Sequence, residues 1–192
     1  MKEKEGRRIP DMLCIGHMCH DRYANGHLLG GTASYASLMS AHLAIDTALL
    51  TSVGQDFKFW EELIKDNLMI ENVSVDQTTE FENVYDGDKR TQYIHARANV
   101  IGVDQVPDNW FDIPTVKLCL IADEVSSEII QSFPNAFKAA SIQGWLRKWD
   151  DSGLVYPRPL DLQLLDGLDM IFLSEDDFSH RALPCVKLIK TL

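Results

Sequence analysis

Short apolar runs alternate with amphipathic stretches along the chain. The first run, Met12–Ile15, predicts a strand. A helix beginning near Thr32 is predicted next, because apolar side chains recur at helical spacing after a glycine pair. These side chains belong to Tyr35, Leu38, Met39, His42 and Leu43. Residues 47–53 predict a second strand that ends at a glycine, and residues 57–64 predict a second amphipathic helix.

The texture changes to alternating polar and apolar positions further along. Residues 80–85 and 90–95 alternate on either side of Asp86-Gly87, which is a β-hairpin signal. Three short apolar runs follow and predict strands at 116–121, 139–142 and 170–173; helical segments at 126–133 and 160–168 separate them. Strands separated by helices favour a parallel α/β sheet. The hairpin and residues 22–29 would then form a small β appendage outside that sheet.

The composition narrows the class of protein. A chain of 192 residues fits one domain, and its net charge of −11 disfavours nucleic acid as a partner, because phosphates need a basic face. A small phosphorylated ligand remains compatible with this charge. We expect no membrane partner, since no apolar stretch approaches the roughly 20 residues of a membrane span. Four scattered cysteines and the lack of a signal peptide indicate a cytoplasmic protein.

Three familiar motifs are tested and rejected. Cys14, His17, Cys19 and His20 are close together, but a structural zinc site normally adds a second ligand pair after a longer loop. The segment 26–32 approaches the phosphate-loop pattern, yet Thr32 stands where that pattern needs lysine. No G-x-G pair is present, so the dinucleotide fingerprint is missing as well.

Polar residues that follow predicted strands are the candidate site residues. Asp21 follows the first strand and is suited to accept hydrogen bonds from a polyol, and Gly30-Gly31 allows a ligand to approach the helix start. Gln143 and Arg147 follow a later strand. Each feature also has a structural interpretation: a tight turn for the glycines, and an N-cap with a favourable helix dipole for the acidic residues 175–177 after Ser174.

In this order and spacing, the segments resemble the ribokinase-like (PfkB) family of carbohydrate kinases. The motifs are Asp21, Gly30-Gly31, residues 49–56, 78–85 and 90–92, the Gln-Gly-Trp-Leu-Arg run at 143–147, and 174–177. The resemblance implies a mainly parallel Rossmann-type sheet flanked by helices, with a small β lid. It also implies ATP and Mg²⁺ as cofactors and a sugar, inositol or nucleoside as substrate.

The resemblance also assigns roles to residues. It implies substrate binding by Asp21, Gly30, Gly31, Tyr35, Gln143 and Arg147, and a water-mediated magnesium contact by Asp177. Tyr35 stands where the family has asparagine. Ser174 and Asp177 replace the two ends of the family's Asn-x-x-Glu motif, so a carboxylate is kept but its reach is shorter.

One family motif is missing. The 192 residues contain no Gly-Ala-Gly-Asp, whose aspartate is the family's catalytic base. We therefore expect the base beyond residue 192, and residues 1–192 to form a single incomplete domain with lid segments around 22–29 and 78–98. This predicts the substrate-binding and lid portion of a kinase, inactive alone. A homodimer through the lid is a separate expectation, because an uncovered strand edge of the lid hairpin is a template for pairing. A non-catalytic binding or regulatory protein, or a Rossmann-like domain with another ligand, is the alternative.

Overall fold

A six-stranded parallel sheet forms the centre of the computed structural model, which describes residues 9–64, 68–87 and 89–174. Its strand order is β12-β9-β8-β1-β4-β5, with every neighbouring pair parallel. The strands are β1 (Met12–Ile15), β4 (Thr47–Thr51), β5 (Met69–Asn72), β8 (Thr115–Cys119), β9 (Phe137–Ser141) and β12 (Met170–Phe172). The predicted parallel α/β class is confirmed, although the pattern missed β5.

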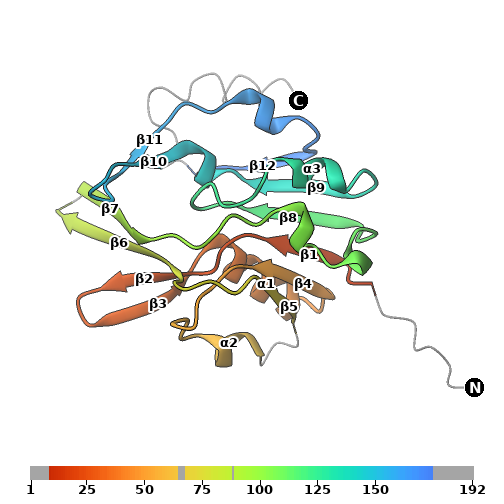
Figure 1. Cartoon of the computed structure of the whole chain (residues 1–192), viewed down its shortest axis with the longest axis horizontal. Helices are drawn as coiled ribbons and strands as arrows, with labels where there is room; N and C mark the ends of the chain where they lie inside the picture. Colours follow the sequence, from red (N-terminus) through yellow and green to blue (C-terminus); the bar gives the residue numbers. More distant parts are fainter. Residues whose placement is uncertain (1–8, 65–67, 88, 175–192) are drawn as a thin grey trace, which may run out of the picture.

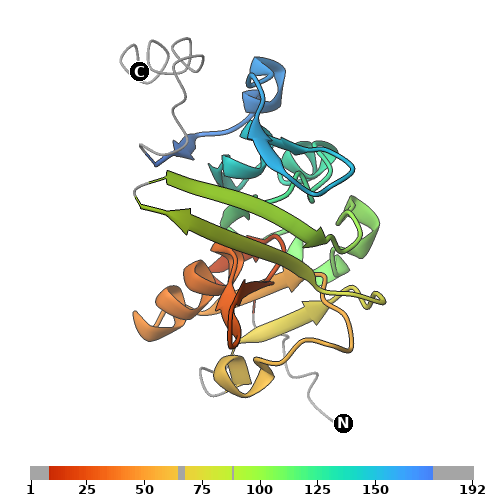
Figure 2. The same cartoon turned by 90° about the vertical axis from the view of Figure 1, so that its left-hand side faces the viewer.

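A second, four-stranded sheet lies beside the first one, at the left in Figure 1. Its order is β3-β2-β6-β7, formed by β2 (Cys19–Tyr23), β3 (Gly26–Gly30), β6 (Thr79–Asp86) and β7 (Lys89–Ala96). The predicted hairpin is the long β6–β7 pair that faces the viewer in Figure 2. The appendage predicted at 22–29 is larger than expected, because β2 begins at Cys19 and is itself a strand.

Helices are few and short in the described part of the chain. The α-helices are α1 (Thr32–His42), α2 (Trp60–Ile64) and α3 (Glu128–Ser132). Short 3₁₀ turns are η1 (Val103–Gln105), η2 (Asp108–Trp110), η3 (Gln143–Leu146) and η4 (Leu162–Leu165). The helix expected over 160–168 is therefore only a 3₁₀ turn. A small hairpin, β10 (Arg147–Trp149) with β11 (Val155–Pro157), was not predicted. No helix among the described residues is long and apolar enough to cross a bilayer.

The helix α1 turns its small residues, not its large ones, toward the sheet. Tyr35 and Met39 are 59% and 62% exposed, whereas Ser34 and Ser37 are fully buried. The buried serines satisfy their hydroxyls within the helix, with Ser34 Oγ donating to the Gly30 carbonyl at 2.7 Å. Small side chains allow the helix to pack closely on β1, β4 and β8. The helix was predicted correctly, but of the side chains on which it was predicted only Leu38 packs against the core, while Tyr35, Met39 and Leu43 are exposed.

The buried apolar residues form three clusters. The largest covers one face of the parallel sheet with α3 and the 3₁₀ turns, and a second fills the space between the other face, α1 and α2. A third, smaller cluster joins the two sheets through Cys19, Phe81, Ile94, Ile121 and Ala122. This third cluster fixes the four-stranded sheet against the strand ends of the parallel sheet.

Candidate substrate site between the two sheets

A polar pocket of about 210 Å³ opens where the two sheets meet. In the parallel sheet, the chain passes from β1 to β4 and β5 on one side and later returns to β8, β9 and β12 on the other side. The direction of the connections therefore reverses between β1 and β8. Ligands of open α/β sheets bind outside the carboxyl ends of strands at such a point. The pocket lies there. Its lining comes from segments that follow β1, β8 and β9 and from the β6–β7 hairpin.

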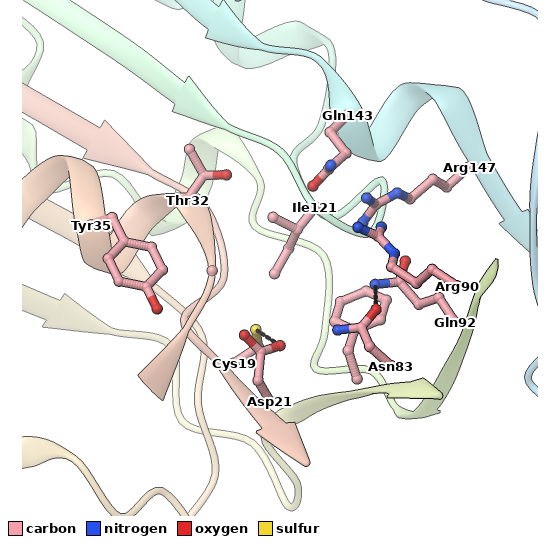
Figure 3. Close-up of a pocket in the computed structure, with 12 residues that line it drawn as sticks. Cys19, Asp21, Thr32, Tyr35, Asn83, Arg90, Gln92, Ile121, Gln143 and Arg147 are labelled. Atoms are coloured by element: carbon pink, nitrogen blue, oxygen red, sulfur yellow. Dashed lines mark hydrogen bonds between the residues drawn. The ribbon is translucent and has the colours of Figure 1, made fainter. Parts of the chain in front are cut away.

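Most of the sequence-predicted site residues meet in this pocket (Figure 3). Asp21, Gly31, Tyr35, Gln143 and Arg147 all line it, although they are up to 126 positions apart in the sequence. Asp177 lies outside the described residues. The remaining lining residues were not predicted as site residues, and they are Cys19, Thr32, Phe81, Asn83, Arg90, Gln92 and Ile121.

Asp21 is the acidic group of the described lining. It lies within β2 rather than directly after β1, so it belongs to the second sheet. Its Oδ1 accepts a weak hydrogen bond from the Cys19 thiol at 3.9 Å. Burial raises the pKa of the Asp21 carboxyl, an effect that the thiol and the guanidiniums of Arg147 and Arg90 oppose. The carboxylate is thus partly desolvated beside positive charge, which suits it to accept hydrogen bonds from a ligand.

Glycine is required at both positions before α1, for a different structural reason at each. Gly31 has φ +93°, and a Cβ there would lie 2.6 Å from the His17 carbonyl oxygen. Gly30 does not line the pocket, contrary to expectation. A Cβ at Gly30 would instead lie 2.5 Å from Asp21 Oδ2 and 2.8 Å from Cys19 Sγ. Gly30 therefore leaves the room that the Asp21 carboxylate occupies against β3.

Opposite Asp21, hydrogen-bond donors gather from two parts of the chain. Asn83 on β6 accepts a hydrogen bond from Gln92 on β7, at 2.9 Å. Arg90 precedes Gln92 on the same face of β7, and Figure 3 shows its guanidinium and that of Arg147 extending toward one region of the pocket. The alternation of the hairpin was the available sequence signal for these residues, since Arg90 and Gln92 are two positions apart on one strand.

Tyr35 lines the pocket from the first turn of α1, opposite the arginines. Its hydroxyl donates to the Leu29 carbonyl at 2.7 Å, which connects α1 to β3. The donor capacity of this hydroxyl is therefore used inside the protein. What Tyr35 offers a ligand is the edge of its ring and the remaining acceptor capacity of the oxygen.

A buried carboxylate, Glu124, holds the strand ends that form the pocket floor. It is fully buried and accepts hydrogen bonds from the backbone N–H groups of His17, Ile121 and Ala122, at 3.3, 2.9 and 2.6 Å. These groups follow β1 and β8, so one side chain joins the two central strands at their carboxyl ends. Sequence reasoning missed Glu124, because an acidic residue beside Asp123 reads as an ordinary surface turn.

His17, also buried, links the two sheets. Its Nε2 donates to the Asn99 carbonyl at 2.9 Å, and its Nδ1 accepts from the Thr79 hydroxyl at 2.8 Å. The carbonyl is only an acceptor, so the network assigns the proton to Nε2. Burial lowers the pKa of His17, which keeps the ring neutral. Both ring nitrogens of this histidine are therefore engaged by protein groups that join the two sheets.

The hairpin β10–β11 is tied to the second sheet. The Ile94 N–H on β7 donates to the Gly153 carbonyl at 2.8 Å. Arg158 donates to the Trp145 carbonyl at 2.7 Å and forms an ion pair with Asp123 at 3.0 Å. These contacts fix the segment that carries Gln143 and Arg147 relative to the sheet that carries Asp21.

The described pocket does not have the donor set of a magnesium site. Mg²⁺ is held by carboxylates, phosphates and water in octahedral geometry. Here the single acidic residue of the described lining, Asp21, shares the pocket with two arginines.

No protein-family model matches the chain, and no curated protein is recognisably similar to it in sequence. Solved structures do resemble it. A pyrophosphate-dependent kinase in the ribokinase family, in a sulfate complex, matches with a TM-score of 0.75 and 16% identity, over 94% of this chain and 69% of that one. A pyrophosphate-dependent myo-inositol-1 kinase converted into a myo-inositol-3 kinase matches with a TM-score of 0.76 and 15% identity, over 94% and 67%.

The fructokinase of Xylella fastidiosa with bound ATP matches with a TM-score of 0.66 and 16% identity, over 95% of this chain and 65% of that one. The chain is thus a parallel α/β protein whose strand ends are covered by a second β-sheet, with a polar pocket between the two. This arrangement is the ribokinase-like fold. The fold class expected from the sequence is confirmed.

Proposed function

We propose that the chain binds a sugar, inositol or nucleoside and forms the acceptor-binding and lid portion of an ATP-dependent kinase. The observation that carries this proposal is the convergence of Asp21, Asn83, Gln92 and the arginines Arg90 and Arg147 on one pocket. Its volume of about 210 Å³ lies below the usual range of about 300–1,000 Å³ for drug-sized ligands, so a small polar ligand fits best.

The pocket chemistry supports recognition of neighbouring hydroxyl groups. A hydroxyl both donates and accepts, so it needs an acceptor and a donor within reach. Asp21 accepts, the arginines donate, and the amides of Asn83 and Gln143 do either. Such a set rejects analogues that lack a hydroxyl, since the buried polar groups would remain unpaired.

The arginines also support a phosphoryl acceptor site. Charge on a transferred phosphoryl group is stabilised by positioned cations, and positioning with electrostatic stabilisation accounts for most of the catalysis in such transfers. Arg90 extends toward the pocket from β7, and Arg147 extends toward it from the start of β10. Asp21 fixes the acceptor ring, a hydroxyl of that ring accepts the phosphoryl group, and the two arginines stabilise the charge on that group. The solved structures with similar folds include a fructokinase with bound ATP and a pyrophosphate-dependent kinase with a pyrophosphate analog, so both donors belong in an assay.

Ligand-induced stabilisation tests the binding step. A ligand that binds only the native state raises the apparent stability, by about 2.7 kcal/mol at one hundred times Kd. We expect one of myo-inositol, fructose or adenosine to raise the Tm of the chain, and Asp21→Asn to abolish that shift. Asp112→Asn is the matched control, since Asp112 is exposed and outside the pocket. No shift with any polyol or nucleoside, or an equal shift in Asp21→Asn, contradicts the proposal.

Dimerisation through the lid remains a prediction. The β7 edge of the second sheet is partly covered, because Tyr93 forms a bridge with Leu154. β3 is the other edge strand. A second copy would therefore pair with β3, and sedimentation of the purified chain at several concentrations tests this.

A further inference from the structure

The second sheet has a reverse face with its own cluster of metal-binding side chains. Side chains alternate along a strand, so the residues between pocket residues point to the other side. On β2, Cys19 and Asp21 line the pocket, whereas His20 lies between them. On β6, Phe81 and Asn83 line it, and Glu80 precedes them.

Strand register brings three of these reverse-face side chains together. His20 pairs directly with Glu80 in the parallel β2–β6 ladder. In the antiparallel β2–β3 ladder, His27 pairs with Arg22, two positions along the same face from His20. One ligand atom from each of His20, His27 and Glu80 lies within 4.8 Å of the other two.

The His20 ring is held in place but is not satisfied. It is 2% exposed, stacks on Phe57 at 5.7 Å between centroids, and meets Phe59 edge-on at 5.7 Å. Its Nε2 is buried, and no hydrogen-bond partner for it exists among the described residues. A buried ring nitrogen without a partner is costly, so its persistence needs an explanation. An ion at the centre of the cluster would supply one.

We propose that His20, His27 and Glu80 form a binding site for a borderline divalent transition-metal ion, with Zn²⁺ as the committed occupant. Two imidazoles and one carboxylate are a donor set typical of zinc sites that keep a fourth position open. Zn²⁺ bonds of about 2.0–2.1 Å separate tetrahedral ligand atoms by roughly 3.3 Å. Ligand atoms that lie up to 4.8 Å apart must therefore approach by at most about 1.5 Å, whereas His27 Nε2 and Glu80 Oε2, 2.8 Å apart, must separate by about 0.5 Å. The His27 and Glu80 side chains are 21% and 19% exposed, which gives the ion a route from solvent.

Neighbouring groups arrange the cluster and define how it changes on binding. Arg22 contacts Glu80 Oε1 at 3.5 Å and so orients the carboxylate, while Oε2 accepts from His27 Nε2 at 2.8 Å. Lys58 Nζ donates to His27 Nδ1 at 3.0 Å. When a metal takes Nε2, the His27 proton moves to Nδ1, which can no longer accept from Lys58. The lysine ammonium is therefore displaced toward solvent, and no proton is released.

Substitution of a ligand and substitution of Lys58 are expected to have opposite effects on metal affinity. His20→Gln or Glu80→Gln removes a ligand and should weaken Zn²⁺ binding by more than about 100-fold. Lys58→Met removes a competing cation and should tighten binding, because it also removes repulsion of the ion. His95→Gln is the matched control. His95 pairs with Glu82 at 2.7 Å on the same sheet, but among the described residues this pair is not part of a group of three possible metal ligands.

Cobalt substitution measures the site directly. The purified full chain, stripped with chelator and titrated with Co²⁺, should bind one equivalent with the visible absorption of tetrahedral N/O coordination, and Zn²⁺ should displace it. Zn²⁺ should also raise the Tm, since an ion that binds only the native state stabilises it. The site is supported if the stoichiometric Co²⁺ absorption is lost in His20→Gln and kept in His95→Gln, and if Lys58→Met binds the ion more tightly. Absence of the Co²⁺ band, an equal loss in His95→Gln, or weaker binding in Lys58→Met overturns it. The metal readouts require no polyol, so they remain interpretable if the proposed function fails.

Discussion

The burial of Asp21 in the pocket lining has a cost in stability. Burial raises its pKa above the ordinary value, so the charged form is less favourable in the folded chain than in the unfolded one. Between pH 3.8 and the raised pKa, the folded state binds more protons, and stability therefore falls as pH rises through that window. At neutral pH the charged carboxylate remains, and its unfavourable desolvation remains with it.

Asp21→Asn is therefore expected to keep or raise the Tm at pH 7 while it removes polyol-induced stabilisation. Thermal unfolding of the two proteins with and without ligand measures both effects together. A lower Tm in the variant would show that the attraction of Arg90 and Arg147 for the carboxylate outweighs its burial.

His17 predicts the opposite slope at mildly acidic pH. Its pKa is lowered in the folded state from 6.5, so the unfolded chain binds the proton more readily below that value. The stability contribution of neutral His17 is complete above about pH 6.5 and decreases as the pH falls toward the folded pKa. One such group contributes a slope of up to about 1.4 kcal/mol per pH unit. Urea unfolding between pH 5 and 7 measures the free energy of unfolding at each pH. This free energy should change less steeply with pH in His17→Gln than in the exposed control His42→Gln.

Glu124 joins the carboxyl ends of β1 and β8 through hydrogen bonds from their backbone N–H groups. Glu124→Gln keeps the size but turns one acceptor oxygen into a donor that faces backbone N–H groups. We expect a loss of about 1–3 kcal/mol in the free energy of unfolding. The control Glu128→Gln on α3, whose carboxylate accepts a hydrogen bond from Ser126 at an exposed position, should lose less than about 0.5 kcal/mol. Equal losses in the two variants would mean that Glu124 does not join β1 to β8.

The approach of β3 to β2 depends similarly on Gly30. Gly30→Ala places a methyl group 2.5 Å from Asp21 Oδ2, and the end of that side chain must move. We expect polyol affinity to fall about tenfold, because about 1.4 kcal/mol corresponds to one misplaced hydrogen bond. Calorimetric titration measures this loss. Gly87→Ala is the control for a glycine substitution outside the pocket: the added Cβ meets no atom within 4 Å, and the φ of +58° predicts a loss of stability, not of affinity. An equal loss of polyol affinity there would exclude the steric explanation.

For the whole molecule, we predict binding without turnover. The 192 residues contain no G-x-G-D, the motif expected to supply the general base and the anion-stabilising helix start. General-base catalysis alone contributes about a hundred- to ten-thousand-fold. A coupled assay with ATP or pyrophosphate and the polyol that binds should detect no product. Turnover that Asp21→Asn abolishes would contradict this prediction and exclude the alternative of a non-catalytic binding protein.

The fold was predictable because strands, glycine turns and the β6–β7 hairpin leave local signals. Asp21, Gly31, Gln143 and Arg147 were predictable as neighbours because the segments after parallel strands converge at one edge. The exposed face of α1 was not predictable from apolar spacing, since its serines satisfy their hydroxyls internally. Glu124 was missed for a different reason: only the folded backbone shows which N–H groups point at it.

The reverse-face cluster needed register, which no local pattern contains. His20 and Glu80 are 60 positions apart, and only the parallel β2–β6 pairing places them opposite each other. The sequence did bring His20 into a rejected zinc motif, but with the wrong partners, because sequence neighbours on a strand point to opposite faces.

The alternation along β2 has a consequence for how this protein can change. His20 and Asp21 are adjacent in the chain yet serve opposite faces of one sheet. Deletion of a single residue near the start of β2 would shift the strand by one position and exchange its two faces. An imidazole would then enter the pocket between the two sheets, and the aspartate would join His27 and Glu80. Descendants of this chain can therefore vary β2 by substitution, one face at a time, whereas a change in its length alters both sites in one step.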